Sequence, residues 1–122
     1  MTQDRPSAAE LVEAVREFLE RDVMAATSGR VQFHTRVAIN ALGMIERELV
    51  EGPAFAAAER ARAASLLGHD GDARTLEREL AAGIRDGSFD DRRDEVRDHV
   101  RRTVREKLLV ANPGYLPADA RE

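Results

Sequence analysis

Residues Phe33 to Leu49 read FHTRVAINALGMIEREL, and this stretch decides the predicted fold. At about 100° per residue its apolar side chains surround almost the whole helix, whereas Arg36, Asn40 and Arg47 lie in one row. A helix that is apolar on nearly every side is typical of the middle of a bundle, and polar groups buried there need partners. The segment therefore predicts a central helix in an all-α protein.

The rest of the chain predicts four more helices around this one. Ser7 and Glu10 form a capping-box pattern, and Gly52 followed by Pro53 is expected to end the central helix and begin the next. No window shows the strict alternation of a half-buried strand. The sequence predicts a compact bundle of about five helices, and their expected ranges are Ser7 to Val23, Val31 to Glu51, Ala54 to Leu67, Ala73 to Asp86 and Arg92 to Ala111.

Length and composition indicate one intracellular domain. A chain of 122 residues with 43% hydrophobic content can bury a core without disulfides. Residues 1–122 are expected to form a single domain, with frayed tails at residues 1–5 and 117–122. The absence of Cys fits a reducing compartment, the N-terminal segment lacks the pattern of a signal peptide, and no apolar run reaches membrane-spanning length. We expect a cytoplasmic protein, and the preference for Arg over Lys suggests a GC-rich bacterial genome.

Several function classes find little support in the sequence. The net charge is −4, and the basic residues of the last predicted helix alternate with acidic ones, as in the pair Asp98 and Arg102. This pattern argues against nucleic acid and membrane partners. No two of the three His residues have the spacing of helical metal ligands, so no metal site is expected. No nucleophile or phosphate-loop motif occurs, and we assign no catalytic residue and no cofactor.

Two groups of polar residues are candidates for a site. Lys107, which is the only Lys, falls on the apolar stripe of the last helix. It either extends along the bundle end with its ammonium in water, or it is partly buried and pairs with Glu46 or Glu48 or holds an anionic ligand. Arg36 and Asn40 either satisfy nearby groups or converge with Lys107 on a phosphate or carboxylate.

Two sequence blocks resemble a known family. One block is Phe33, His34, Arg36, Val37, Ala38, Asn40, Ala41 and Leu42, and the other is Lys107, Leu108, Val110, Ala111, Asn112, Pro113, Tyr115 and Leu116. Together they resemble a bacterial domain of unknown function, and the resemblance extends from about Pro6 to Leu116. Small all-helical proteins of that family are encoded beside aminoglycoside phosphotransferase-like kinases and acyl-CoA dehydrogenases. Gly114 departs from the pattern, since a basic residue is more typical there.

The resemblance implies an accessory role, and two functions therefore compete. The leading hypothesis is a non-catalytic interaction module for a phosphotransferase-like kinase or an acyl-CoA dehydrogenase. The alternative is a small-molecule binding protein for an anionic ligand. Homo-oligomerisation is left open. The candidate residues for binding a partner or ligand are His34, Arg36, Asn40, Lys107, Asn112 and Tyr115.

Overall fold

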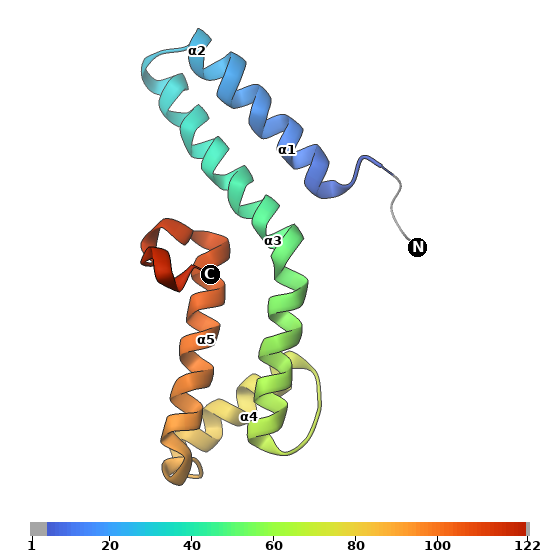
Figure 1. Cartoon of the computed structure of the whole chain (residues 1–122), viewed down its shortest axis with the longest axis vertical. Coiled ribbons are helices and arrows are strands. Elements are labelled where there is room, and N and C mark those ends of the chain that lie inside the picture. Colours follow the sequence, from blue (N-terminus) through green and yellow to red (C-terminus); the bar gives the residue numbers. More distant parts are fainter. Residues whose placement is uncertain (1–4, 122) are drawn as a thin grey trace. The chain divides into compact units, whose positions relative to one another are not determined.

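The computed structural model describes residues 5–121, and in this range the chain forms helices and no strand (Figure 1). The prediction of an all-α fold is confirmed. The chain divides into two compact units, a first unit of Met1–Gly52 with Val110–Asn112 and a second unit of Pro53–Leu109 with Pro113–Glu122. The expectation of a single domain stays a prediction, and each unit is described by itself. The helices are α1 (Ala8–Phe18), α2 (Met24–Ala26), α3 (Gly29–Leu67), α4 (Ala73–Asp86) and α5 (Arg93–Ala111).

The start of α1 follows the predicted capping box. The Ser7 hydroxyl accepts a hydrogen bond from the Glu10 backbone N–H, and the Glu10 carboxylate accepts one from the Ser7 backbone N–H, both at 3.2 Å. These two bonds satisfy donors that the first helical turn would otherwise leave free. The α1 helix continues through a π-helical segment, Leu19–Val23, into α2. The expected frayed N-terminal tail falls mostly on residues 1–4, which lie outside the described residues.

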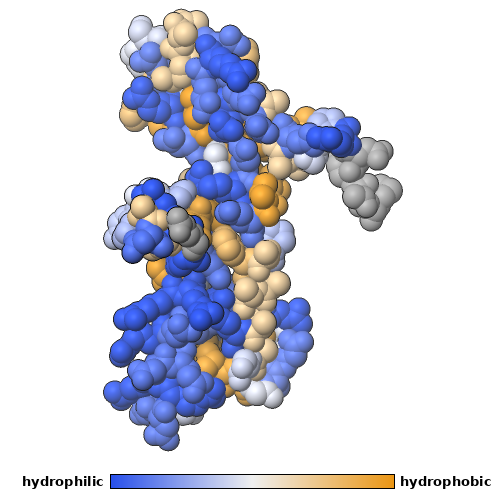
Figure 2. All heavy atoms as spheres, viewed as in Figure 1, coloured by the Kyte–Doolittle hydropathy of each residue, from blue (hydrophilic) through white to orange (hydrophobic). Residues whose placement is uncertain are grey.

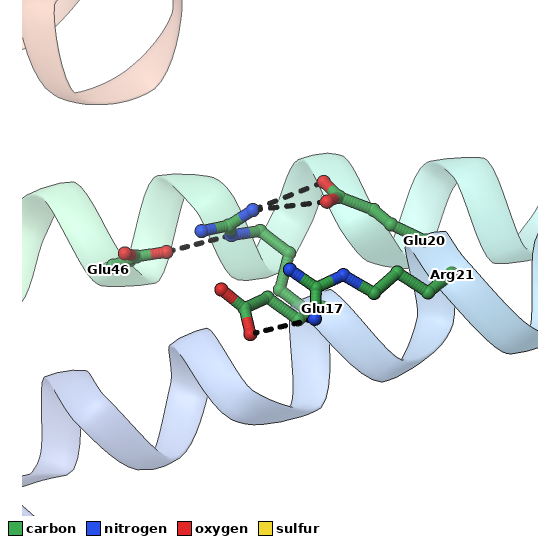
Figure 3. Close-up of polar contacts among 5 residues, drawn as sticks. Glu17, Glu20, Arg21 and Glu46 are labelled. Carbon is green, nitrogen blue, oxygen red and sulfur yellow. Dashed lines mark hydrogen bonds and ion pairs between the residues drawn. The ribbon is translucent and has the colours of Figure 1, made fainter.

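The first unit is a hairpin in which α1 and the beginning of α3 run side by side in opposite directions (Figure 1). The Arg16 guanidinium connects the two helices, because its Nε donates to Glu46 at 2.9 Å while its Nη1 pairs with Glu20 at 3.2 Å (Figure 3). At the turn, the Gln32 amide donates to the carbonyls of Met24 and Thr27. One ion pair thus connects α1 to α3, and the Gln32 amide fixes the turn to the start of α3.

The helix break predicted at Gly52 and Pro53 was wrong. The α3 helix runs without interruption from Gly29 to Leu67 and contains Pro53 in its interior. Gly52 does not take the left-handed conformation that a C-terminal helix cap needs, since positive φ occurs at Gly29, Gly68 and Gly87 among the described glycines. Pro53 removes one backbone donor, and the helix continues through that loss. Two predicted helices are thus one, although the two units meet at this point in the sequence.

The buried hydrophobic residues lie in the second unit. They are Ala63 and Leu66 of α3 and Leu76 and Leu80 of α4, and Leu76 is fully buried. The predicted ends of α4 are confirmed: the Asp72 carboxylate accepts the Thr75 N–H, and Gly87 closes the helix with φ 86°.

At the C-terminal end of the described chain, residues 118–120 form a short 3-10 turn. This segment belongs to the tail that the sequence led us to expect to be frayed. The Ala120 carbonyl accepts a hydrogen bond of 2.8 Å from Arg105 Nε, and Arg121 Nε donates to the Leu116 carbonyl at 2.9 Å.

Candidate functional site

The candidate residues of the first sequence block lie on the exposed side of α3 in the first unit. His34, Arg36 and Asn40 are all exposed, whereas Thr35 on the other side of the helix is buried. Glu46 also lies on that other side, since it pairs with Arg16 of α1. The sequence pattern predicted that these polar groups would be enclosed by a bundle. The structure corrects this, because the side of α3 that carries them faces away from α1.

Three large apolar residues lie among these polar groups on the same side of α3. Phe33 is 63% exposed, Val37 is 49% exposed and Met44 is 40% exposed. With Asn40 they are spaced four, three and four residues apart, which places them in one row along a helix. We call Phe33, Val37, Asn40 and Met44 the outer stripe of α3. In Figure 2, hydrophobic residues reach the surface along α3 among hydrophilic ones.

The polar groups beside the outer stripe have no partners within residues 5–121. Neither Arg36 nor Asn40 makes a hydrogen bond or an ion pair there, and the recorded contact of His34 is an edge-on approach to the Phe33 ring at 5.4 Å. Arg47, the last member of the predicted row, differs from them because its Nε donates to the Val110 carbonyl at 2.8 Å. That bond satisfies one of the free carbonyls at the end of α5, so Arg47 has a structural role.

The remaining candidates, Lys107, Asn112 and Tyr115, are also exposed. Lys107 is exposed on α5, which agrees with the first of its two predicted alternatives, an ammonium group in water. The described residues give it no ion pair or hydrogen bond, and Glu46, one of its predicted partners, pairs with Arg16. Its charge does act on Glu59, where burial raises the pKa of the carboxyl group and Lys107 opposes that increase.

The six candidates are divided between the two units. Asn112 belongs to the first unit, as do His34, Arg36 and Asn40, whereas Lys107 and Tyr115 belong to the second. Tyr115 ends the short 3-10 turn Pro113–Tyr115 and is 73% exposed. A common pocket for Arg36, Asn40 and Lys107 stays a prediction.

Sequence reasoning missed a polar cluster inside the second unit. The Arg62 guanidinium of α3 pairs with both carboxylate oxygens of Glu106 on α5, at 3.0 and 3.3 Å. It also donates to the Thr103 hydroxyl and to Nδ1 of His99, each at 3.2 Å. The Arg62 side chain is 18% exposed and that of Glu106 is 13% exposed. This cluster fixes α5 against α3. A separation of 44 residues between Arg62 and Glu106 leaves no local pattern that could have revealed the pair.

A shallow hollow of about 240 Å³ also lies in the second unit, where the end of α4 meets the start of α5. It contains none of the six candidates. Its lining residues are Ile84, Phe89, Asp90, Arg93, Val96 and Arg97.

Residues 5–121 contain neither a cluster of metal ligands nor a membrane-spanning helix. Within that range, no group of three or more His, Asp or Glu residues is placed to hold a metal ion. In the same part of the chain, no helix has both the length and the apolar character to cross a bilayer.

Comparison with known proteins places the candidate residues inside one family match. The family model described as a domain of unknown function, DUF6285, matches residues 25–115. This range is narrower than the resemblance expected from the sequence, because it leaves out α1, but it includes all six candidate residues. No curated protein and no solved structure matches the chain.

Proposed function

The chain belongs to this family of unknown function, and from that premise we propose that it is a non-catalytic interaction module for a phosphotransferase-like kinase or an acyl-CoA dehydrogenase. The module would act in the bacterial cytoplasm. The partner classes come from the family resemblance in the sequence, and the mode of binding comes from the surface of the first unit.

The observation that supports this proposal most strongly is the outer stripe of α3. An exposed Phe33 at 63% next to Val37 at 49% leaves apolar surface in water without a covering element. Exposed apolar side chains gathered on one helix face mark interaction sites more often than scattered ones do. The same face carries Arg36 and Asn40, whose polar groups have no partner in the described chain. Apolar anchors beside free hydrogen-bonding groups are typical of a protein interface.

The chemistry of the stripe indicates what the partner presents. An aromatic ring such as Phe33 requires an apolar pocket, and a free Arg36 guanidinium suits a carboxylate that it can bind through two parallel hydrogen bonds. Asn40 can donate to a backbone carbonyl and accept from a backbone N–H. We therefore expect a hydrophobic groove with an acidic rim on the partner, of the kind that receives one face of a helix.

The stripe fits a protein partner better than a small ligand. Small-molecule sites are concave and enclose most of the ligand, whereas the outer stripe lies on the convex side of one helix. An anionic ligand held by Arg36 and Asn40 is the alternative, and it would require Lys107 or another cation to complete the site.

The test is binding of the purified chain to each purified candidate partner, measured by titration calorimetry with matched variants. Val37→Glu places a carboxylate in the stripe and is expected to weaken binding by about 2 kcal/mol or more, which is roughly 30-fold. Val104→Glu is the matched control, because Val104 on α5 is 49% exposed, as Val37 is, and belongs to the second unit. Equal loss in both variants would refute the assigned surface.

The ligand alternative is tested in the same preparation. If neither partner binds, and inorganic phosphate or an acyl-CoA raises the melting temperature of the wild type but not of Arg36→Ala, the small-molecule function replaces the interaction module.

A further inference from the structure

A second apolar surface lies on one side of the hairpin and is distinct from the outer stripe. We call it the hairpin face and define it as Leu11, Val15 and Phe18 of α1 with Val31, Ala38, Ile45 and Leu49 of α3. The six large members are between 42% and 57% exposed. At about 100° per residue, the α1 members fall within about 60° of one another and the α3 members within about 40°. Each set therefore forms a single stripe.

The two stripes lie on the same side of the hairpin. On α1 the side that faces α3 carries Arg16, and on α3 the side that faces α1 carries Glu46, as their ion pair shows. Viewed along the hairpin from one end, two antiparallel right-handed helices wind in opposite senses. The turn from the inner side to the stripe is therefore clockwise on one helix and anticlockwise on the other, so both stripes lie on the same flank of the hairpin. The other flank carries Arg47, which binds the Val110 carbonyl. The segment around Val110 thus approaches one flank of the hairpin, and the hairpin face lies on the opposite flank.

The hairpin face is almost free of charge in an otherwise highly charged chain. By the same helical count, Glu13 and Glu17 of α1, Glu20 of the π-helical segment, and Arg36 and Arg47 of α3 fall outside it. Asp22, near the turn of the hairpin, falls within the α1 stripe, since it follows Leu11 by eleven residues. Apart from this residue at one end, the strip across the two helices carries no charge, which is the pattern of a surface that another protein covers.

The first unit also lacks a hydrophobic core of its own within the described residues. The buried hydrophobic residues of that range all belong to the second unit. Two helices without a buried interior are not stable in water, so the hairpin needs a cover that is present whenever the chain is folded. A second copy of the chain meets this requirement because it is made together with the first.

The exposed area agrees with what a dimer needs. The six large side chains each leave on the order of 100 Å² in water, so two copies would bury roughly 1,200 Å² in total. That value reaches the lower limit for specific, stable interfaces, and Ala38 in the middle of the face permits close approach of the helices. A two-fold axis would place each hairpin face on the same face of the other copy. We infer that the chain forms a homodimer in which two hairpins pack into a four-helix bundle.

This inference rests on different residues from the proposed partner site, so each can fail alone. The first measurement is sedimentation equilibrium of the full chain over a wide range of concentrations. The wild type is expected to have twice the monomer mass of 13.5 kDa. A wild type that stays monomeric at every concentration tested would overturn the inference.

Matched variants then locate the interface. Val15→Glu puts a carboxylate from each copy into the dimer contact and is expected to raise the dissociation constant roughly 100-fold or more. Val37→Glu makes the same change at a site with nearly the same exposure on the outer stripe, and its dimer is expected to match the wild type. Dissociation caused by Val37→Glu but not by Val15→Glu would show that another surface forms the dimer.

A spin-label measurement keeps the test independent of whether Val15→Glu folds. The chain has no Cys, so Arg21→Cys introduces a unique labelling site in the π-helical segment, at a side chain that is 76% exposed and is not a member of the hairpin face. The label is expected to give one well-defined distance between copies, which disappears on dilution with unlabelled chain. The absence of any intermolecular distance would contradict the four-helix bundle.

Discussion

The ion pair between Arg62 and Glu106 gives the sharpest test of how the second unit is held together. Glu106→Gln preserves the shape of the side chain but removes its charge, so the Arg62 guanidinium keeps its bonds to Thr103 and His99 and loses its counter-ion. Side-chain exposures of 13% and 18% mean that water can replace little of the lost interaction. Removing one partner of a fully buried pair costs about 3 to 5 kcal/mol, and one hydrogen bond to a charged group is worth about 1.5 to 3 kcal/mol.

We therefore expect Glu106→Gln to lower the free energy of unfolding by about 2 to 4 kcal/mol. The assay is urea denaturation followed by circular dichroism at pH 7.5 and a fixed protein concentration. Asp98→Asn is the matched control on the same helix, because the Asp98 and Arg102 side chains are 62% and 61% exposed and their pair should contribute below about 0.5 kcal/mol. Equal small losses in both variants would refute the account of this cluster as a buried clamp.

Two further predictions concern the second unit. Burial, and then the positive charge of Arg62, lower the pKa of His99, so the folded chain keeps this imidazole neutral while the unfolded chain binds a proton near pH 6.5. The free energy of unfolding is therefore expected to fall as the pH drops through 6.5 toward the lowered pKa. Measured by urea denaturation, this decrease should be smaller in His99→Gln than in the wild type. Identical pH profiles of the two proteins would contradict a role for His99. Gly83→Ala would bring a methyl group to 2.8 Å from Phe89 Cδ2. We expect this crowding to lower the free energy of unfolding by about 1 to 3 kcal/mol in the same assay. An unchanged free energy of unfolding would show that the Phe89 ring moves freely.

Local signals in the sequence predicted the helix ends well. Ser7 with Glu10, Asp72 and Gly87 act through hydrogen bonds or backbone conformations that involve residues at most a few positions away. The same local reasoning failed at Pro53, because a proline weakens a helix without requiring that it end. Whether the helix continues depends on contacts beyond the neighbouring residues.

The surroundings of the central helix could not be predicted from its composition. Apolar residues on nearly all sides of Phe33 to Leu49 indicate burial, but the pattern does not say which molecule provides the cover. The structure leaves Val37 and Ile45 exposed on two different sides of α3. On our account, a partner protein covers Val37 and a second copy of the chain covers Ile45. Arg36 and Asn40 were therefore assigned correctly to one row and wrongly to the interior of the chain.

The contacts of the long basic side chains could not be predicted from the sequence either. Helical periodicity placed Lys107 on an apolar stripe, but Val100 and Val104 of the same stripe are 46% and 49% exposed, so the stripe is not enclosed and the Lys107 side chain is exposed as well. Arg62 and Arg47 bind groups 44 and 63 residues away in the sequence. Such pairs depend on how helices pack, and a single sequence carries no local record of them.

The central claim is that the outer stripe of α3 is the surface that a protein partner covers. Hydrogen–deuterium exchange of the chain, with and without a saturating amount of the kinase-like or dehydrogenase partner, tests it most directly. We predict slower exchange on partner binding in the segment from Phe33 to Met44, with the segment from Leu11 to Phe18 unchanged. Binding that leaves Phe33 to Met44 unprotected, or no binding by either partner, would contradict the claim.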